Sequence, residues 1–222
     1  MKGLIFNPHL STDPILCNDL PMPALLKDYA LIRVIRAGIC GTDLEMMQGY
    51  KDGFEGVLGH EFVGIVEEVK ASNKDKQKWL RQRVVGEINI NCTECPTCVD
   101  DRNTYMRRNH CPNRSCLGII GKDGAFAEYI TLPIQNLYVV PESISDAHAV
   151  FVEPIAAAYR IVEQNIIQKN DKICIIGDGK LGLLTAEVLV YAVDKSVTIS
   201  MLGKHLEKLH LGNSKCYKIL AS

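Results

Sequence analysis

The chain has 222 residues, 47% of them hydrophobic, so it can bury a sizeable core and is not a disordered segment. Its 25 basic and 26 acidic residues give a formal net charge of -1, which argues against nucleic acid or an anionic membrane as a partner. Because the sequence shows no signal peptide and no run of ~18 apolar residues, we expect a cytoplasmic protein that binds a small molecule. In that compartment, clustered cysteines indicate metal binding or catalysis rather than disulfides.

The first part of the chain consists of short apolar runs separated by Gly, Pro and Asn, a pattern typical of an all-β unit. We predict strands over 29–38, 62–69, 83–90 and 125–133, and a charged surface loop or short helix over 71–82. The pattern changes after Pro141. Helical spacing over 145–167 precedes a buried strand at 172–177, a helix at 181–193 and a strand at 197–202.

A strand, a helix and a strand in so few residues form a βαβ unit, which requires a parallel sheet. The expected fold class is therefore mixed α and β, with a β-rich domain over 1–145 and a connecting helix and α/β domain over 146–222. Cys174 lies inside the first strand of the α/β domain, where we expect it to be packed.

The turn between the strand at 172–177 and the next helix reads GDGKLG, a complete G-x-G-x-x-G motif. Its first glycine permits the tight turn, the second lets the backbone approach a pyrophosphate, and the third allows the helix to pack closely on the strand. The strand before the turn and the helix after it are the context that this motif needs, so we predict dinucleotide binding rather than a plain glycine-rich turn. The motif residues assigned to the cofactor are Gly177, Gly179, Lys180, Leu181 and Gly182.

The end of the second strand bears on which dinucleotide is bound. An NAD site usually has Asp or Glu there, about 20 residues after the motif, to hold the ribose 2′-hydroxyl. This chain instead has Gly203, Lys204 and His205, and a small residue followed by cations suits a 2′-phosphate better. The sequence therefore favours NADP over NAD, the alternative being that Lys204 and His205 simply begin a solvated helix.

A second group of residues has the side chains of a mixed metal site. Cys40, His60 and Glu153 offer a thiolate, an imidazole and a carboxylate, the kinds of ligand found around catalytic zinc with an open position. Taken singly, a cytosolic Cys is more often a small buried residue, and a lone His more often a satisfied polar one. On a regular strand His60 and Glu61 would face opposite ways, so we expect either Glu61 or Glu153 as the third ligand.

Five of the nine cysteines lie between residues 92 and 116. Cys92, Cys95 and Cys98 follow one another at steps of three, a spacing that wraps around one metal ion, and a fourth thiolate would close a structural zinc site. An iron–sulfur cluster uses similar spacing but takes its fourth Cys after three intervening residues, and none is present there.

The motifs GICGTD, GHEFVG, the cysteine run ending in CPN, VEPIAAA and GDGKLG resemble, in this order, the zinc-dependent medium-chain alcohol dehydrogenase family. The resemblance covers nearly the whole chain. It implies a GroES-like zinc-binding catalytic domain, a Rossmann domain behind it, one catalytic and one structural zinc, and reversible oxidation of an alcohol or polyol by NAD(P). Within the family, Glu153 makes the chain more similar to the polyol and threonine dehydrogenase branches than to the ethanol branch.

The resemblance also implies roles for individual residues. Cys40 and His60 match the zinc ligands, and Thr42 matches the hydroxyl that relays the substrate proton. Asp43 matches the acid that orients the zinc-binding histidine. The remaining carboxylates are Glu61, which matches the acid after that histidine, and Glu153, which matches the third ligand of the polyol-type branches.

In the resembling family the fourth structural cysteine comes eight positions after the third. Here that position is Met106, and the next cysteine is Cys111, followed by Pro and Asn as in the family. We therefore predict Cys111 as the fourth ligand, with five extra residues in a solvated loop, because loop closure depends only weakly on length. Cys116 leads into the apolar sequence LGIIG and is expected to be a core thiol.

The sequence ends after what we predict to be a third strand within 216–220, whereas a complete domain of this type has six. The Rossmann domain is thus expected to be incomplete, and the alternative to an active enzyme is a truncated, non-catalytic zinc-binding form or a fragment. The sequence leaves a homo-oligomer open.

Overall fold

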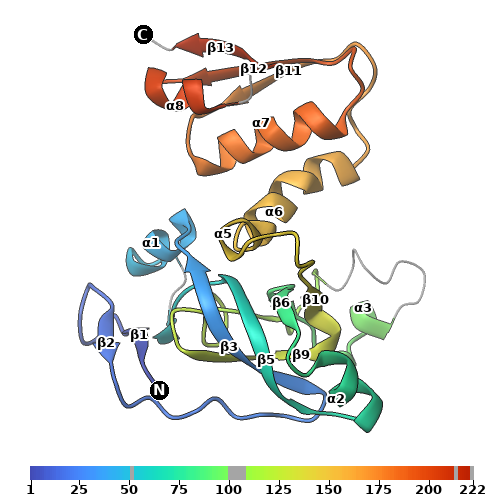
Figure 1. The fold of residues 1–222 in the computed structure, drawn as a ribbon. Coiled ribbons are helices and arrows are strands. Elements are labelled where there is room, and N and C mark those ends of the chain that lie inside the picture. The colour runs from blue at the N-terminus through green and yellow to red at the C-terminus, as the bar shows by residue number, and fades with distance from the viewer. Residues whose placement is uncertain (51–52, 100–108, 213–214, 221–222) are drawn as a thin grey trace. The chain divides into compact units, whose positions relative to one another are not determined.

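The computed structural model describes residues 1–50, 53–99, 109–212 and 215–220. Its contacts divide the chain into two compact units, Met1–Glu153 and Pro154–Ser222 (Figure 1). In the part of the chain described, no helix is both long enough and apolar enough to cross a membrane. The predicted mixed α and β class is confirmed.

The first unit is built on a five-stranded antiparallel sheet with the strand order β10-β6-β5-β3-β9. Its buried face is rich in β-branched and leucine side chains, among them Ile32, Val66 and Leu132, all completely buried. The strands of this sheet are β3 (Tyr29–Gly38), β5 (Glu61–Lys70), β6 (Arg83–Gly86), β9 (Tyr129–Pro133) and β10 (Leu137–Val139).

Smaller elements surround this sheet. A three-stranded sheet has the order β2-β1-β4, and a two-stranded pair joins β7 to β8. The bounds of these strands are β1 (Gly3–Phe6), β2 (Ile15–Cys17), β4 (Gly56–Val57), β7 (Asn89–Ile90) and β8 (Ser115–Cys116). The helices of the unit are α1 (Gly41–Met47), α2 (Asn73–Trp79), α3 (Pro96–Val99), the 3₁₀ turn η2 (Ile134–Asn136) and α5 (Asp146–Ala149).

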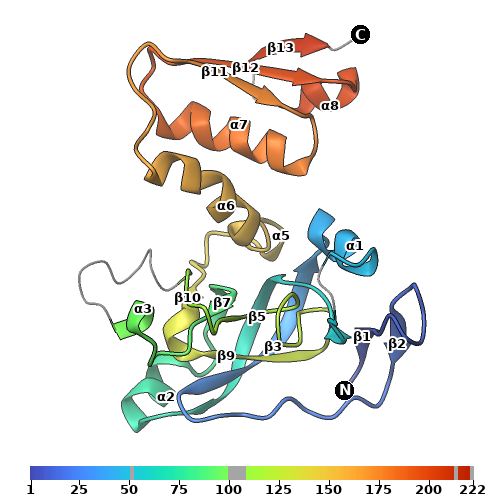
Figure 2. The ribbon, with the colours of Figure 1, turned by 180° about the vertical axis from the view of Figure 1, so that it is seen from behind.

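The second unit contains the predicted βαβ arrangement. Its three strands are parallel and adjacent in chain order, and α7 lies along the sheet (Figure 2). The side chains of Ala186 and Leu189 in α7 are buried in the core of this unit. The elements are α6 (Val152–Glu163), β11 (Lys172–Ile176), α7 (Lys180–Ala192), β12 (Thr198–Gly203), α8 (Leu206–Leu211) and β13 (Tyr217–Leu220). The expectation that Cys174 is packed is wrong. It is exposed, as is Ile176, because these two residues alternate along β11 with Ile173 and Ile175, which pack in the core, and so lie on the opposite face of the strand.

Two predicted elements are each divided in the structure. The single strand expected over 83–90 is β6 followed by β7, and β7 leaves the central sheet to pair with β8. The single helix expected over 145–167 is α5 followed by α6. Pro154 explains the second break, because proline has no N–H to donate and its ring disfavours a helical turn before it, so a helix tolerates it only in the first turn.

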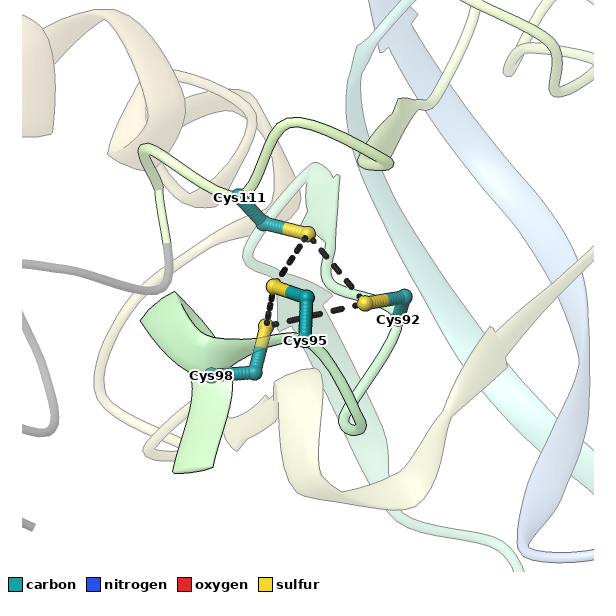
Figure 3. A group of neighbouring side chains, drawn as sticks. All are labelled: Cys92, Cys95, Cys98 and Cys111. Carbon is teal, nitrogen blue, oxygen red and sulfur yellow. Dashed lines mark hydrogen bonds between the residues drawn. The ribbon is translucent and has the colours of Figure 1, made fainter. Parts of the chain in front are cut away.

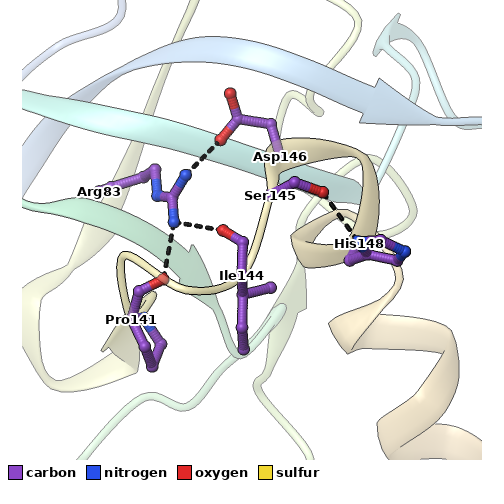
Figure 4. Close-up of polar contacts among 6 residues, drawn as sticks. All are labelled: Arg83, Pro141, Ile144, Ser145, Asp146 and His148. Atoms are coloured by element: carbon purple, nitrogen blue, oxygen red, sulfur yellow. Dashed lines mark hydrogen bonds and ion pairs between the residues drawn. The ribbon is translucent and has the colours of Figure 1, made fainter.

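Arg83 fixes the segment between β10 and α5 (Figure 4). Its guanidinium donates to the Asp146 carboxylate at 3.0 Å, to the carbonyl of Pro141 at 2.8 Å, and to the carbonyl of Ile144. Its own carbonyl accepts the N–H of Val140 at 2.8 Å. Arg83, at the start of β6, thus forms hydrogen bonds with four residues of the segment that leads into α5.

Replacing Arg83 with Met is expected to lower the free energy of unfolding of the first unit by about 2 kcal/mol. The reason is that two carbonyls and a carboxylate lose a charged donor in a partly buried place. Denaturant unfolding measures this change. Arg81→Met is the matched control, because the Arg81 side chain is 75% exposed and its pair with Glu67 is worth at most about 1 kcal/mol. Equal effects of the two substitutions would contradict the role given to Arg83.

Candidate metal centres and dinucleotide-binding turn

The pairing of β3 with β5 brings the first candidate site together. Gly38, the last residue of β3, lies opposite Glu61, the first residue of β5. Cys40 therefore follows one strand at the point where His60 precedes the other. Gly59, with φ +95°, turns the backbone before His60 out of regular strand geometry. This is the irregularity that His60 and Glu61 need if both are to face one site.

Asp43 connects the two ends of this arrangement. One carboxylate oxygen accepts the N–H of Cys40 at 2.8 Å, and the other accepts the N–H of Gly59 at 3.1 Å. The second oxygen also lies 3.4 Å from Nδ1 of His60. The side chains of Asp43 and His60 are each 4% exposed, so the Asp43 carboxylate is a buried group that supports the imidazole.

The ligand atoms of Cys40, His60 and Glu61 all lie within 4.8 Å of one another. Among the side chains that the structure describes, His60 Nδ1 is the one buried polar atom without a hydrogen-bond partner, since its contact with Asp43 lacks suitable geometry. A thiol, an imidazole and a carboxylate at such distances suit zinc. The residues therefore fit a metal ion with one open position.

Electrostatics in this group favour a charged pair. The His60 imidazole lowers the pKa of the Cys40 thiol. Burial works to lower the pKa of His60, but the neighbouring Asp43, Cys40 and Glu153 outweigh it and raise the pKa to about 10. A metal ion that binds here must replace the proton held between thiol and imidazole.

Glu153 stands near this group but is not part of it in the described chain. Burial raises the pKa of its carboxyl; the charge of His60 opposes that rise, and the carboxylates of Glu61, Glu87 and Asp43 add to it. Of the two carboxylates that the sequence left open as third ligand, the structure places Glu61 with Cys40 and His60. Glu61 also lies against Gly38, where a Cβ would come within 2.1 Å of its Oε2.

The second candidate site is formed by Cys92, Cys95, Cys98 and Cys111 (Figure 3). Four Sγ–Sγ distances measure 3.4, 3.5, 3.8 and 3.9 Å. Four thiolates about 2.3 Å from a tetrahedral zinc are separated by ~3.8 Å, so the set fits a closed site with no room for a substrate.

The segment that carries the four cysteines, here called the cysteine lobe, lies between β7 and β8 in the chain, and these two strands pair with each other. β7 ends two residues before Cys92, and β8 begins four residues after Cys111. Cys116 belongs to β8 and packs in the central core, where burial raises the pKa of its thiol to about 12. The predicted solvated insertion, including Met106, falls on 100–108, which lie outside the described residues.

The glycine-rich turn has the shape that dinucleotide binding requires. Gly177 has φ +118°, and its N–H donates to the carbonyl of Leu202 at 2.8 Å. A Cβ on Gly177 or Gly179 would meet nothing within 4 Å, so the turn leaves open space for a ligand. A Cβ on Gly182 would lie 2.3 Å from the carbonyl of Gly177, which explains the third glycine by close packing. The turn thus fits a pyrophosphate at the start of α7.

Asp178, between the first two glycines, has contacts that the sequence pattern does not predict. It accepts the N–H of His205 at 2.6 Å, and its oxygens lie 3.1 Å from Nδ1 of the same histidine. The predicted cofactor residues Lys204 and His205 therefore stand at the end of β12 beside a carboxylate. The only sequence signal was an acidic side chain inside a glycine-rich turn.

Comparison with known proteins identifies the family. The alcohol dehydrogenase GroES-like domain family matches residues 27–142, more than half of the chain. The chain belongs to the zinc-dependent medium-chain alcohol dehydrogenase family. The GroES-like domain that the sequence predicted is thereby confirmed.

Dehydrogenases of the threonine and polyol type are among the relatives of this family member. L-threonine 3-dehydrogenase of Streptomyces avermitilis is 36% identical over 203 residues, which cover 87% of this chain and 55% of the relative. Sorbitol dehydrogenase of Bacillus subtilis is 31% identical over 83% of this chain and 51% of its own length. The chain thus spans about half the length of the curated relatives that it matches.

Solved structures of family members with bound dinucleotide share the fold. A protein from Sinorhizobium meliloti described as a zinc-binding dehydrogenase, bound to NADP, matches with TM-score 0.82 and 28% identity, over 99% of this chain and 61% of its own. An alcohol dehydrogenase from Escherichia coli in complex with NADH matches with TM-score 0.84 and 25% identity, over 100% and 63%. Both dinucleotides thus occur in proteins with this fold.

Proposed function

We propose that this chain carries the metal site and the first half of the dinucleotide-binding domain of a dehydrogenase that oxidises an alcohol or polyol reversibly with NAD(P). The observation that carries the proposal is the group of Cys40, His60 and Glu61, with ligand atoms within 4.8 Å of one another. The names of the relatives, which act on threonine and sorbitol, support a substrate with a hydroxyl group.

Two zinc ions are proposed for each chain. Cys40, His60 and Glu61 would hold the catalytic ion, and Glu153, whose carboxylate acts electrostatically on His60, is the alternative to Glu61 as third ligand. When bound, this zinc supplies a positive charge that polarises the alcohol oxygen and lowers the pKa of its hydroxyl. The residues proposed for the structural ion are Cys92, Cys95, Cys98 and Cys111.

Two residues of α1 serve the reaction in this proposal. The Thr42 hydroxyl lies 3.7 Å from Cys40 Sγ and is partly exposed, so it can pass the proton of the substrate toward solvent. Asp43 holds the imidazole of His60 in place from its buried position and raises its basicity as a ligand. Hydride transfer then requires the substrate carbon and the nicotinamide to be held together.

We propose NADP rather than NAD as the cofactor. The end of β12 supports this choice, because Lys204, which is exposed, offers a 2′-phosphate a cation. Gly177, Gly179, Lys180, Leu181 and Gly182 would surround the pyrophosphate.

The test is turnover by the purified 222-residue chain with NADP and NAD over a panel of alcohols and polyols, followed by the absorbance of the reduced nicotinamide. The expected result is turnover with at least one secondary alcohol or polyol, lost on Thr42→Val with bound zinc unchanged. Two bound zinc ions without turnover on any substrate would contradict the proposed activity and favour a zinc-binding form without catalysis.

A further inference from the structure

The carboxylate of Asp178 lies directly against the last residue of β12. A Cβ built on Gly203 would stand 2.6 Å from both Cβ and Oδ2 of Asp178. The Asp178 side chain is 10% exposed and is held by the His205 N–H at 2.6 Å. The glycine-rich turn thus places the Asp178 carboxylate beside the end of β12.

This position matters because the end of the second strand faces the adenosine ribose in dinucleotide-binding folds. An acid there usually comes from the strand itself and accepts the ribose 2′-hydroxyl, whereas a 2′-phosphate calls for cations and space. Residues 202–205 contain no acid. Asp178 supplies from the first turn the carboxylate that the strand lacks.

Resting on the dinucleotide site proposed above, we propose that Asp178 is a specificity-determining residue that opposes a 2′-phosphate and favours a 2′-hydroxyl. It acts against Lys204, which attracts the phosphate. His205 is committed to Asp178 through its N–H and lies with its ring nitrogen 3.1 Å from the carboxylate. The choice of cofactor is then a balance between the Asp178 carboxylate and the Lys204 ammonium group.

The carboxylate carries its negative charge at neutral pH. Hydrogen bonds from the His205 N–H and then from its ring lower the pKa of Asp178 to about 2. At separations of a few ångströms, well inside the ~10 Å screening length at moderate ionic strength, a fixed charge acts on a phosphate with little loss.

The experiment compares adenosine 2′,5′-bisphosphate with adenosine 5′-monophosphate, which carry the adenosine half of NADP and of NAD. Calorimetric titration of the full chain gives the ratio of the two affinities. Asp178→Asn keeps an acceptor for the His205 N–H but removes the charge. The ratio is expected to shift toward the bisphosphate by about tenfold, the effect of one unit charge at short range.

Asp194→Asn is the matched control. Asp194 lies in the same unit and also accepts a backbone N–H, that of Ser196 at 2.9 Å, but it lies before the start of β12 and not beside its end. Its substitution should leave the ratio unchanged. Asp178→Ser, which also retains an acceptor, is the second neutral variant, and unfolding curves show which variants are folded.

Two results would overturn the inference in different ways. If the wild-type chain binds both nucleotides and neither folded neutral variant changes the ratio, Asp178 has no part in selectivity and the dinucleotide site stands. If the wild-type chain binds neither nucleotide, the proposed dinucleotide site itself is wrong, and the selectivity role falls with it.

Discussion

Replacing His60 with glutamine is expected to empty the Cys40–His60–Glu61 group of metal and to lower turnover by at least about 100-fold. His60 is 3% exposed and stands between the Cys40 thiol and the Asp43 carboxylate, so no other imidazole of the described chain can take its place. Loss of a residue that only orients a ligand already costs about 10- to 100-fold in metal affinity or activity, and loss of the ligand should exceed this. Metal analysis and turnover of the same preparation measure both effects.

His148→Gln is the control for this substitution. His148 is exposed and contacts Ser145 at the start of α5, 2.8 Å from Nδ1 to Oγ (Figure 4). It should keep full metal content and turnover. Asp43→Asn should fall between the two, because it weakens the support of the imidazole without removing a ligand. A His60→Gln variant with two zinc ions and ordinary turnover would place the catalytic metal elsewhere.

Replacing Cys111 with serine is expected to lower bound zinc from about two ions to about one and to reduce the melting temperature. Cys111 is completely buried, and its Sγ lies 3.5 Å from that of Cys92 and 3.8 Å from that of Cys95. A metal that binds only the folded state adds its binding free energy to stability, so losing it destabilises the lobe. Metal analysis and thermal unfolding with and without a chelator check the result.

Cys116→Ser separates the metal role from ordinary packing. Cys116 is 5% exposed and lies in the core, so its substitution should also cost stability but leave the zinc count unchanged. If instead Cys116→Ser removed a zinc ion and Cys111→Ser did not, the fourth ligand would be Cys116.

The sequence predicted best those helices and strands whose local pattern of apolar residues matches the residues that are buried in the core. The strand predicted at 29–38 matches β3 residue for residue, and the βαβ unit follows the predicted order. Alternating burial and helical spacing are short-range signals, so they could be read before the fold was known. The division of 145–167 into α5 and α6 depends on Pro154, because a helix tolerates proline only in its first turn.

The parts that escaped prediction depend on contacts between distant residues. Asp178 meets His205 across 27 positions, and Arg83 meets Asp146 across 63. No periodicity predicts such pairs, because they follow from how strands lie beside one another. The choice of Glu61 over Glu153 as neighbour of Cys40 and His60 likewise depended on the positive φ of Gly59, which the sequence could only suggest.

Three glycines around His60 leave little freedom for change by mutation. A Cβ on Gly118 would lie 2.3 Å from the carbonyl oxygen of Gly59, and one on Gly124 would lie 2.2 Å from it. Gly59 itself has φ +95°, and its own Cβ would strike the ring of Phe126 at 2.6 Å. The atoms in the way are backbone atoms, which cannot move aside as the end of a flexible side chain can. Even alanine therefore does not fit at positions 118 and 124. Evolution can therefore alter this site only by changing the side chains that surround it, while the peptide that presents the histidine stays fixed in place.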